Sequence, residues 1–234
     1  MAYEIENTMS SFKKAVEMGA GIETDVHLTK DNMLICFHDS AFQIGDNWCS
    51  VKNLPFSELI NLQFRDNRKI PTVEELFQTF KDRSNELRYS CDIGNKDVGI
   101  KLISLAQKFS ILEKVEITDL KLRVLSNLRK FNKDIKLVLT IRQDIAKINS
   151  KTVDFENVKD LDIKAVNIKS NRATLENFKK IIDNGLKSYV WSVNRRSEMK
   201  KVLQLKYKNE IVDAVYTDYP DVLIELKNKL LGSK

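Results

Sequence analysis

The chain has 234 residues and a hydrophobic share of 42%, which suits one large domain with a sizeable core. No apolar run approaches the roughly 20 residues that cross a bilayer, and no secretory signal is visible, so we predict a cytoplasmic protein without a transmembrane segment. The net charge of +6 comes from lysines interleaved with Glu and Asp, without a zinc-finger, helix-turn-helix or arginine-rich pattern, so nucleic acid is not an expected partner.

Apolar strands and amphipathic helices alternate along the whole chain. Thr72, with Glu75 three residues later, predicts a helix N-cap. In chain order, the pattern predicts a helix at 7–18, extended runs at 22–28 and 33–37, a helix at 71–80, a strand at 87–93, a helix at 98–109, a strand at 114–118, a helix at 120–131, strands at 136–141 and 165–168, a helix at 174–184, a strand at 188–193, a helix at 197–205, a strand at 214–217 and a helix at 221–231.

This alternation predicts an α/β fold with a parallel sheet and right-handed crossovers. Seven of the strands belong to the main sheet, whereas a closed barrel of this class has eight, so a strand ahead of residue 1 is expected to be absent. The stretch 39–69 reads as a polar loop that contains aromatic residues, and no linker or repeat divides the single domain 1–234. An open barrel edge would favour a homo-oligomer or a covering helix.

The three cysteines, Cys36, Cys49 and Cys91, are odd in number and lack CxxC spacing. They therefore predict neither a disulfide framework nor a zinc site. Cys36 and Cys91 lie in apolar, strand-like runs and are expected to be small core residues, which suits a reducing compartment.

Two carboxylates on one strand suggest a metal site. Glu23, Asp25 and His27 alternate along the strand at 22–28 and therefore share one face. Both faces of a parallel barrel strand are covered, and two carboxylates there repel each other unless a cation compensates. Their oxygens suit Mg²⁺ or Ca²⁺. The alternative is that these side chains are polar residues on a half-exposed strand.

His38 follows the apolar run at 33–37. Histidine titrates near neutrality, as a proton-transfer group should. A phosphodiester requires charge neutralisation on its phosphoryl oxygens, a base for the nucleophile and an acid for the leaving alkoxide; carboxylates with a metal supply the first and a histidine one of the others. The alternative is a hydrogen-bonded structural histidine.

Several motifs together resemble one family. In order from about residue 5 to 221, they are E-N-T at 6–8 with Phe12, G-A-G-I-E-T-D-V-H-L-T-K-D at 19–31, H-D at 38–39, I-P-T-V-E-E at 70–75, W-S-V-N at 191–194 and T-D-Y-P-D at 217–221. The sequence carrying them resembles the glycerophosphodiester phosphodiesterase family.

The resemblance implies a TIM-type (β/α) barrel of the phospholipase-C-like phosphodiesterase kind, with a small insertion at about 39–70. It implies a divalent metal, Mg²⁺ or Ca²⁺, held by Glu23 and Asp25, and a catalytic His38. It assigns Asp92 as a third metal ligand, where the family usually has the Glu of an E-x-K motif. It also places Trp191 at the substrate pocket, although a strand core residue is the alternative reading.

The sequence departs from the family in two places. The family's first strand ends in H-R-G, which supplies a second acid/base histidine and an arginine that contacts phosphate. The two histidines here, His27 and His38, do not occupy that place, although His27 could substitute from its position on the carboxylate face. In addition, Gly94 occupies the position of the E-x-K lysine.

The resemblance implies hydrolysis of glycerophosphodiesters to glycerol 3-phosphate and an alcohol, a reaction of lipid and glycerol metabolism. A substrate hydroxyl could attack phosphorus first, giving a cyclic phosphate that water then opens. Two alternatives stay open. One is a catalytically impaired member that binds phosphate esters or a protein partner. The other is a lysophospholipase D-like enzyme that forms a cyclic phosphate from lysophospholipids.

Overall fold

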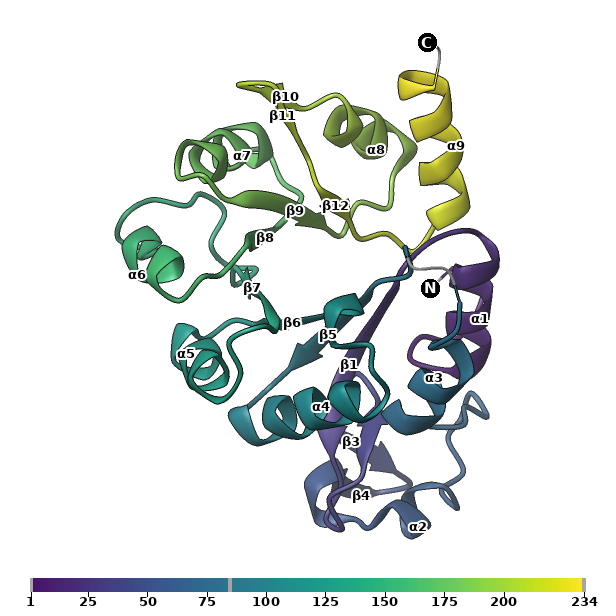
Figure 1. Cartoon of the computed structure of the whole chain (residues 1–234). Coiled ribbons are helices and arrows are strands. Elements are labelled where there is room, and N and C mark those ends of the chain that lie inside the picture. Colours follow the sequence, from purple (N-terminus) through teal and green to yellow (C-terminus); the bar gives the residue numbers. More distant parts are fainter. Residues whose placement is uncertain (1, 84–85, 233–234) are drawn as a thin grey trace. The chain divides into compact units, whose positions relative to one another are not determined.

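The computed structural model describes residues 2–83 and 86–232. The chain forms two compact units, Met1–Ile117 with Asn127–Ile135 and Thr118–Ser126 with Lys136–Lys234. We refer to them as unit 1 and unit 2. In both, strands and helices alternate, as the apolar pattern predicts (Figure 1).

Unit 1 contains the candidate site residues Glu23, Asp25, His38 and Asp92. Its elements are α1 (Met9–Glu17), β1 (Ile22–Leu28), β2 (Leu34–Cys36), β3 (Ala41–Ile44), β4 (Asn47–Ser50), the 3-10 helix η1 (Val51–Asn53), α2 (Phe56–Leu59), α3 (Val73–Phe80), β5 (Tyr89–Ile93), α4 (Lys96–Lys108), the 3-10 helix η2 (Leu112–Lys114) and the first part of β6 (Val115–Asp119).

The main sheet of unit 1 has the strand order β6-β5-β1-β2. β1 and β5 are parallel, while β2 pairs antiparallel with β1 and places Cys36 opposite Val26. The extended run after the first strand therefore joins the main sheet, although it does not count among the seven predicted strands. Cys36 and Cys91 are completely buried, which confirms them as small core residues, and burial raises the pKa of the Cys36 thiol to about 12.

The helix expected from residue 71 is observed as α3. Thr72 is its N-cap: its hydroxyl accepts a hydrogen bond from the Glu75 backbone N–H, and the Glu75 carboxylate accepts one from the Thr72 backbone N–H. This reciprocal capping satisfies donors that the first turn would otherwise leave without partners. The start of the helix could be predicted from the sequence because Thr72 and Glu75, the two partners of the cap, lie within four residues of each other.

The segment 39–70 has more secondary structure than a loop. β3 and β4 form a hairpin in which Phe42 lies opposite Cys49. Phe42 packs edge-on against Phe37 at 5.5 Å between ring centroids and contacts Phe64 at 5.3 Å. This small aromatic core fixes the segment beside the end of β2. That 39–70 is an insertion into one domain stays a prediction.

Unit 2 has four parallel strands in the order β12-β9-β8-β7. Its elements, apart from the end of β6 and the α5 helix (Leu122–Phe131) that runs across the unit boundary, are β7 (Lys136–Thr140), α6 (Phe155–Asp160), β8 (Ala165–Lys169), α7 (Thr174–Asp183), β9 (Lys187–Trp191), α8 (Arg196–Leu203), β10 (Lys206–Tyr207), β11 (Glu210–Ile211), β12 (Ala214–Val215) and α9 (Pro220–Leu231).

Two elements of unit 2 are not predicted from the sequence, α6 and the β10–β11 hairpin. The hairpin turns at Lys208 and Asn209, both with positive φ. Such turns usually carry glycine at one position, so Lys-Asn gives only a weak turn signal. Its strands of two residues are also too short to show alternation.

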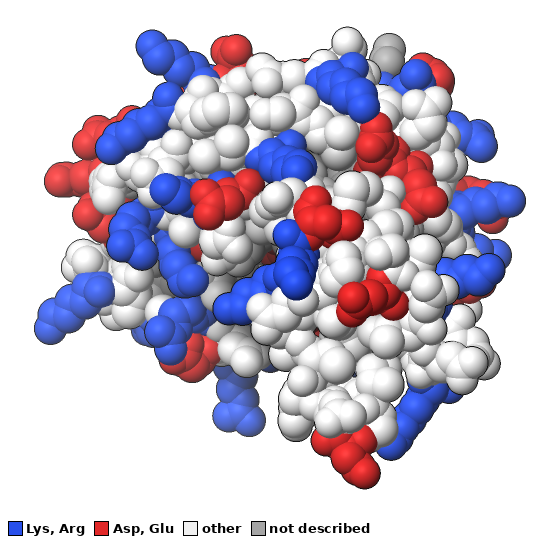
Figure 2. All heavy atoms as spheres, turned by 90° about the horizontal axis from the view of Figure 1, so that it is seen from below, with Lys and Arg blue, Asp and Glu red and all other residues white. Residues whose placement is uncertain are grey.

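The surface carries mixed charge. On the face drawn in Figure 2, basic and acidic side chains are interspersed, as the interleaving of Lys with Glu and Asp along the sequence suggests. None of the helices in the described part of the chain is both long and apolar enough to cross a membrane.

Candidate functional site

Three carboxylates come together in unit 1. Glu23 and Asp25 project from β1, and the parallel register places Asp92 of β5 directly opposite Asp25. One oxygen from each of the three carboxylates lies within 4.8 Å of the others. The strand pairing therefore joins two residues from one local motif with a third that is 67 positions further along the chain than Asp25.

The electrostatics of this carboxylate cluster disfavour three free charges. Desolvation of the carboxyl by the surrounding protein atoms raises the pKa of Glu23 well above its usual value. Repulsion from Asp25 and Asp92 raises this pKa further. Burial also raises the pKa of Asp25, although a hydrogen bond from Asn7 and the nearby His38 oppose the shift. Carboxylates forced together in this way favour either protonation or a bound cation.

A hard divalent cation fits the cluster. All three donors are carboxylate oxygens, the ligand type that Mg²⁺ and Ca²⁺ prefer over sulfur or imidazole. Glu23 keeps solvent access, so an ion can reach it. A bound cation would offset the repulsion that raises the pKa of Glu23. The assignment of Glu23, Asp25 and Asp92 as metal ligands stays a prediction.

Asn7 holds Asp25 in place, a role that was not predicted from the sequence. Its side-chain Nδ2 donates to Asp25 Oδ2 at 3.0 Å, while its Oδ1 accepts from the Asp25 backbone N at 3.1 Å and from Thr24 Oγ1 at 2.6 Å. Asn7 is buried and has a positive φ of 54°. Asparagine tolerates this left-handed backbone better than most residues. An asparagine just before the helix cap is therefore a weak sequence indication of a left-handed residue there.

Replacing Asn7 should therefore destabilise the fold and loosen Asp25. We expect Asn7→Gly, which keeps the left-handed backbone available, to lose about 1–3 kcal/mol of unfolding free energy, because Thr24 Oγ1 and the Asp25 N–H lose their acceptor. Asn7→Ala should lose about 1 kcal/mol more, since it adds backbone strain. Urea unfolding of both variants measures this. An Asn7→Gly variant as stable as the unmodified protein would show that the amide contacts contribute nothing.

His38 lies next to the carboxylate cluster. It follows β2, and the preceding Phe37 donates its backbone N–H to the Asp25 carbonyl at 2.9 Å. His38 Nδ1 is 2.9 Å from Asp39 Oδ1, and this hydrogen bond is the main cause of its raised pKa. The imidazole side chain is 58% exposed, and within the described residues no partner occupies its Nε2. That nitrogen is therefore free to exchange a proton with a bound molecule.

His27 makes a different contact. Its Nε2 lies 3.2 Å from the backbone carbonyl of His38, and its ring is half-buried. It therefore helps to fix the backbone that carries His38. A proton-transfer role for His27 stays a prediction.

Trp191 belongs to unit 2, at the end of β9. Lys169 Nζ lies over its ring, 5.1 Å from the centroid. Its indole Nε1 is buried, and among the described residues it finds no hydrogen-bond partner. A buried donor without a partner is uncommon and is compatible with a ligand contact. Substrate binding by Trp191 stays a prediction.

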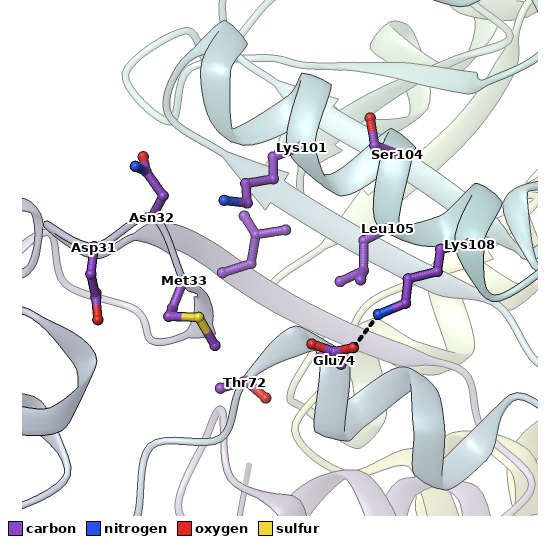
Figure 3. Close-up of a pocket in the computed structure, with 10 residues that line it drawn as sticks. Asp31, Asn32, Met33, Thr72, Glu74, Lys101, Ser104, Leu105 and Lys108 are labelled. Carbon is purple, nitrogen blue, oxygen red and sulfur yellow. Dashed lines mark hydrogen bonds and ion pairs between the residues drawn. The ribbon is translucent and has the colours of Figure 1, made fainter.

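A groove of about 320 Å³ lies elsewhere in unit 1 (Figure 3). It is bordered by the turn after β1, the start of α3 and one side of α4, and Lys108 pairs with Glu74 across it at 2.6 Å. Both partners of this ion pair are exposed, so it contributes little to stability. The lining includes neither the three carboxylates nor His38, so the groove is separate from the candidate site.

Several known proteins are similar to this chain in sequence or in structure. A glycerophosphodiester phosphodiesterase of Caldanaerobacter subterraneus subsp. tengcongensis is 28% identical, over 96% of this chain and 93% of its own. A crystal structure of a glycerophosphodiester phosphodiesterase from Parabacteroides distasonis superposes with a TM-score of 0.79 at 20% identity, over 96% of this chain and 91% of that one.

A third similar protein is a phosphodiesterase from Oleispira antarctica, whose structure is in complex with the product sn-glycerol-3-phosphate. It superposes with a TM-score of 0.74 at 18% identity, over 94% of this chain and 90% of that one. The structural likenesses confirm the α/β fold of the TIM-type barrel class. The sequence profile of the glycerophosphoryl diester phosphodiesterase family, a family of phosphoric diester hydrolases, matches residues 1–222. The chain therefore belongs to the glycerophosphoryl diester phosphodiesterase family.

Proposed function

We propose that this protein is a metal-dependent phosphodiesterase that cleaves glycerophosphodiesters to sn-glycerol 3-phosphate and an alcohol. The observation that carries the proposal is the cluster of three carboxylates whose oxygens lie within 4.8 Å of one another. The backbone hydrogen bond from Phe37 to Asp25 positions His38 beside this cluster. A cation site next to a titratable imidazole provides two of the functions that phosphodiester hydrolysis requires.

In this proposal, Glu23, Asp25 and Asp92 hold a Mg²⁺ or Ca²⁺ ion. When bound, a divalent cation supplies charge neutralisation at the phosphoryl oxygens. His38 exchanges the proton, either by donating it to the leaving alkoxide or by removing it from the attacking hydroxyl. The Asp39 hydrogen bond raises the pKa of His38 and so favours the protonated imidazole, which supports the role of general acid.

The names of the relatives support a glycerophosphodiester as the substrate class. Several of them are named glycerophosphodiester phosphodiesterases, and the Oleispira antarctica structure contains sn-glycerol-3-phosphate as product. The proposed partner is therefore a small water-soluble diester such as glycerophosphocholine.

The direct test is turnover by the purified protein. With Mg²⁺ or Ca²⁺ present, we expect release of sn-glycerol 3-phosphate from glycerophosphocholine, measured by a coupled dehydrogenase assay, and loss of this activity after chelation with EDTA. Turnover no greater than that of a His38→Ala variant would contradict the proposal.

Two further measurements separate the alternatives. Binding of the diester with metal, measured by calorimetry in the absence of turnover, would support a catalytically impaired binding protein. Formation of a cyclic phosphate from lysophosphatidylcholine, detected by ³¹P NMR, would support the lysophospholipase D-like reaction.

A further inference from the structure

An arginine from the segment 39–70 lies beside the candidate site. The guanidinium carbon of Arg68 is 5.5 Å from the centroid of the Phe37 ring. Phe37 immediately precedes His38, and its backbone N–H binds the carbonyl of Asp25. Arg68 therefore lies on the ring of the residue that precedes His38 and whose backbone is hydrogen-bonded to Asp25.

The Arg68 side chain has a fixed orientation. Asp66 Oδ2 accepts hydrogen bonds from Arg68 Nε at 2.8 Å and from Nη2 at 2.6 Å. With the ring of Phe37 on one side, the Arg68 side chain is only 19% exposed. An arginine held by a carboxylate and an aromatic face is preorganised, so it loses little entropy when it binds an anion.

Asp66 does not use all the donors of Arg68. A guanidinium has five N–H groups, and Asp66 takes the one on Nε and one on Nη2. In the part of the chain that the structure describes, no partner takes the two N–H groups of Nη1 or the second one of Nη2. These donors form the planar fork that matches two oxygens of a phosphate.

Two carboxylates close to Arg68 also affect the residues of the candidate site. After its hydrogen bonds to Asp66, the carboxylates of Glu6 and Asp39 also raise the pKa of Arg68. The same two carboxylates also raise the pKa of His38, and Glu6 raises the pKa of both Glu23 and Asp25. Arg68 is thus a permanent cation at the edge of a group of carboxylates that would repel a phosphodiester anion.

We propose that Arg68 binds the phosphate group of the substrate by donating N–H groups to its non-bridging oxygens. The inference rests on the proposed function, because it assumes a phosphodiester at the carboxylate cluster. Arg68 would then be a substrate-binding residue contributed by the segment 39–70.

The test compares Arg68→Gln and Arg68→Lys with Arg88→Gln. Arg88 is exposed and precedes β5, at the opposite end of that strand from Asp92, so its variant removes one charge from the same unit away from the site. Calorimetry with inorganic phosphate in the presence of Mg²⁺ measures anion binding without turnover. We expect Arg68→Gln to weaken phosphate binding about 10- to 100-fold, which is typical for the loss of charge-assisted hydrogen bonds.

Steady-state kinetics should rank the variants in the same order. With glycerophosphocholine, Arg68→Gln should raise KM by a similar factor and Arg68→Lys should raise it less. The KM of Arg88→Gln should equal that of the unmodified protein. Unchanged phosphate affinity and KM in Arg68→Gln would overturn the proposal, as would an equal loss in Arg88→Gln. Loss of Mg²⁺ binding in Arg68→Gln would also overturn it, because it would indicate a structural role.

Two further outcomes keep the proposals separate. If Arg68→Gln does not fold, Arg68→Lys decides, since a lysine retains the charge but not the planar fork; wild-type phosphate affinity in that variant would overturn the role of the fork. If the unmodified protein binds phosphate through Arg68 but shows no turnover, the proposed hydrolysis fails and the binding role of Arg68 stands.

Discussion

Replacing His38 by alanine is expected to lower kcat for glycerophosphocholine by about 10²–10⁴-fold, the usual contribution of a general acid or base. The loss should appear in kcat more than in KM, because proton transfer takes place in the transition state. Metal affinity should change little, since the proposed ligands are Glu23, Asp25 and Asp92. Steady-state kinetics together with calorimetric titration of Mg²⁺ measures both quantities.

The matched comparison is His27→Gln. Since the His27 ring is hydrogen-bonded to the backbone carbonyl of His38, a glutamine that can still donate a hydrogen bond there should preserve most of the activity. A loss in His27→Gln as large as that in His38→Ala would instead assign a proton-transfer role to His27. Full activity in His38→Ala would remove His38 from the mechanism.

The pH profile gives an independent check of the role of His38. The hydrogen bond that His38 donates to Asp39 raises the pKa of His38, so its protonated form persists to higher pH than in a free imidazole. If His38 acts as the acid, activity falls as pH rises through that pKa. Asp39→Asn should lower this pKa and move the alkaline limb of the kcat profile to lower pH. An unmoved alkaline limb would contradict the acid role.

The second large effect is expected for Glu23→Gln, with opposite signs in the absence and presence of metal. Without metal, the variant should be more stable than the unmodified protein at neutral pH, because it removes a carboxylate crowded by protein atoms and by Asp25 and Asp92. With metal, the unmodified protein should gain stability by mass action, about 2.7 kcal/mol at a concentration 100 times Kd. Glu23→Gln should lose most of that gain.

The sign of the pH dependence follows from the raised pKa of Glu23. Below a pH of about 4.5, the usual pKa of a glutamate, the carboxyl is protonated in both the folded and the unfolded state and does not change the free energy of unfolding. As pH rises towards the higher folded pKa, the unfolded state releases its proton first, and the folded state loses stability relative to it. The advantage of Glu23→Gln in EDTA should therefore be absent at pH 4 and grow towards neutrality.

Thermal unfolding with EDTA and with Mg²⁺ measures these differences. Glu58→Gln is the matched control, since Glu58 is an exposed carboxylate on α2 in the same unit. It should retain the metal-dependent gain and show no advantage in EDTA. A Glu23→Gln variant that is still stabilised by Mg²⁺ as strongly as the unmodified protein would remove Glu23 from the metal site.

Patterns within a few residues were sufficient to predict much of the fold. The alternation of Glu23 and Asp25 on one strand and the capping of α3 by Thr72 and Glu75 are local, because strand periodicity and helix capping depend on near neighbours. The hairpin of β3 and β4 was not predicted, since Phe42 packs against Phe37 and Phe64, which lie outside the hairpin and which strand alternation does not relate to it.

The candidate site, too, could be predicted from the sequence only in part. The sequence by itself determined the carboxylate pair on β1 and the histidine after β2, while Asp92 could be reached only through the family resemblance. Only the tertiary structure decided that Asp92 lies opposite Asp25, that Asn7 holds Asp25, and that Arg68 lies on the ring of Phe37. The physical reason is that these contacts depend on strand register and loop packing, which join residues that local sequence patterns cannot relate.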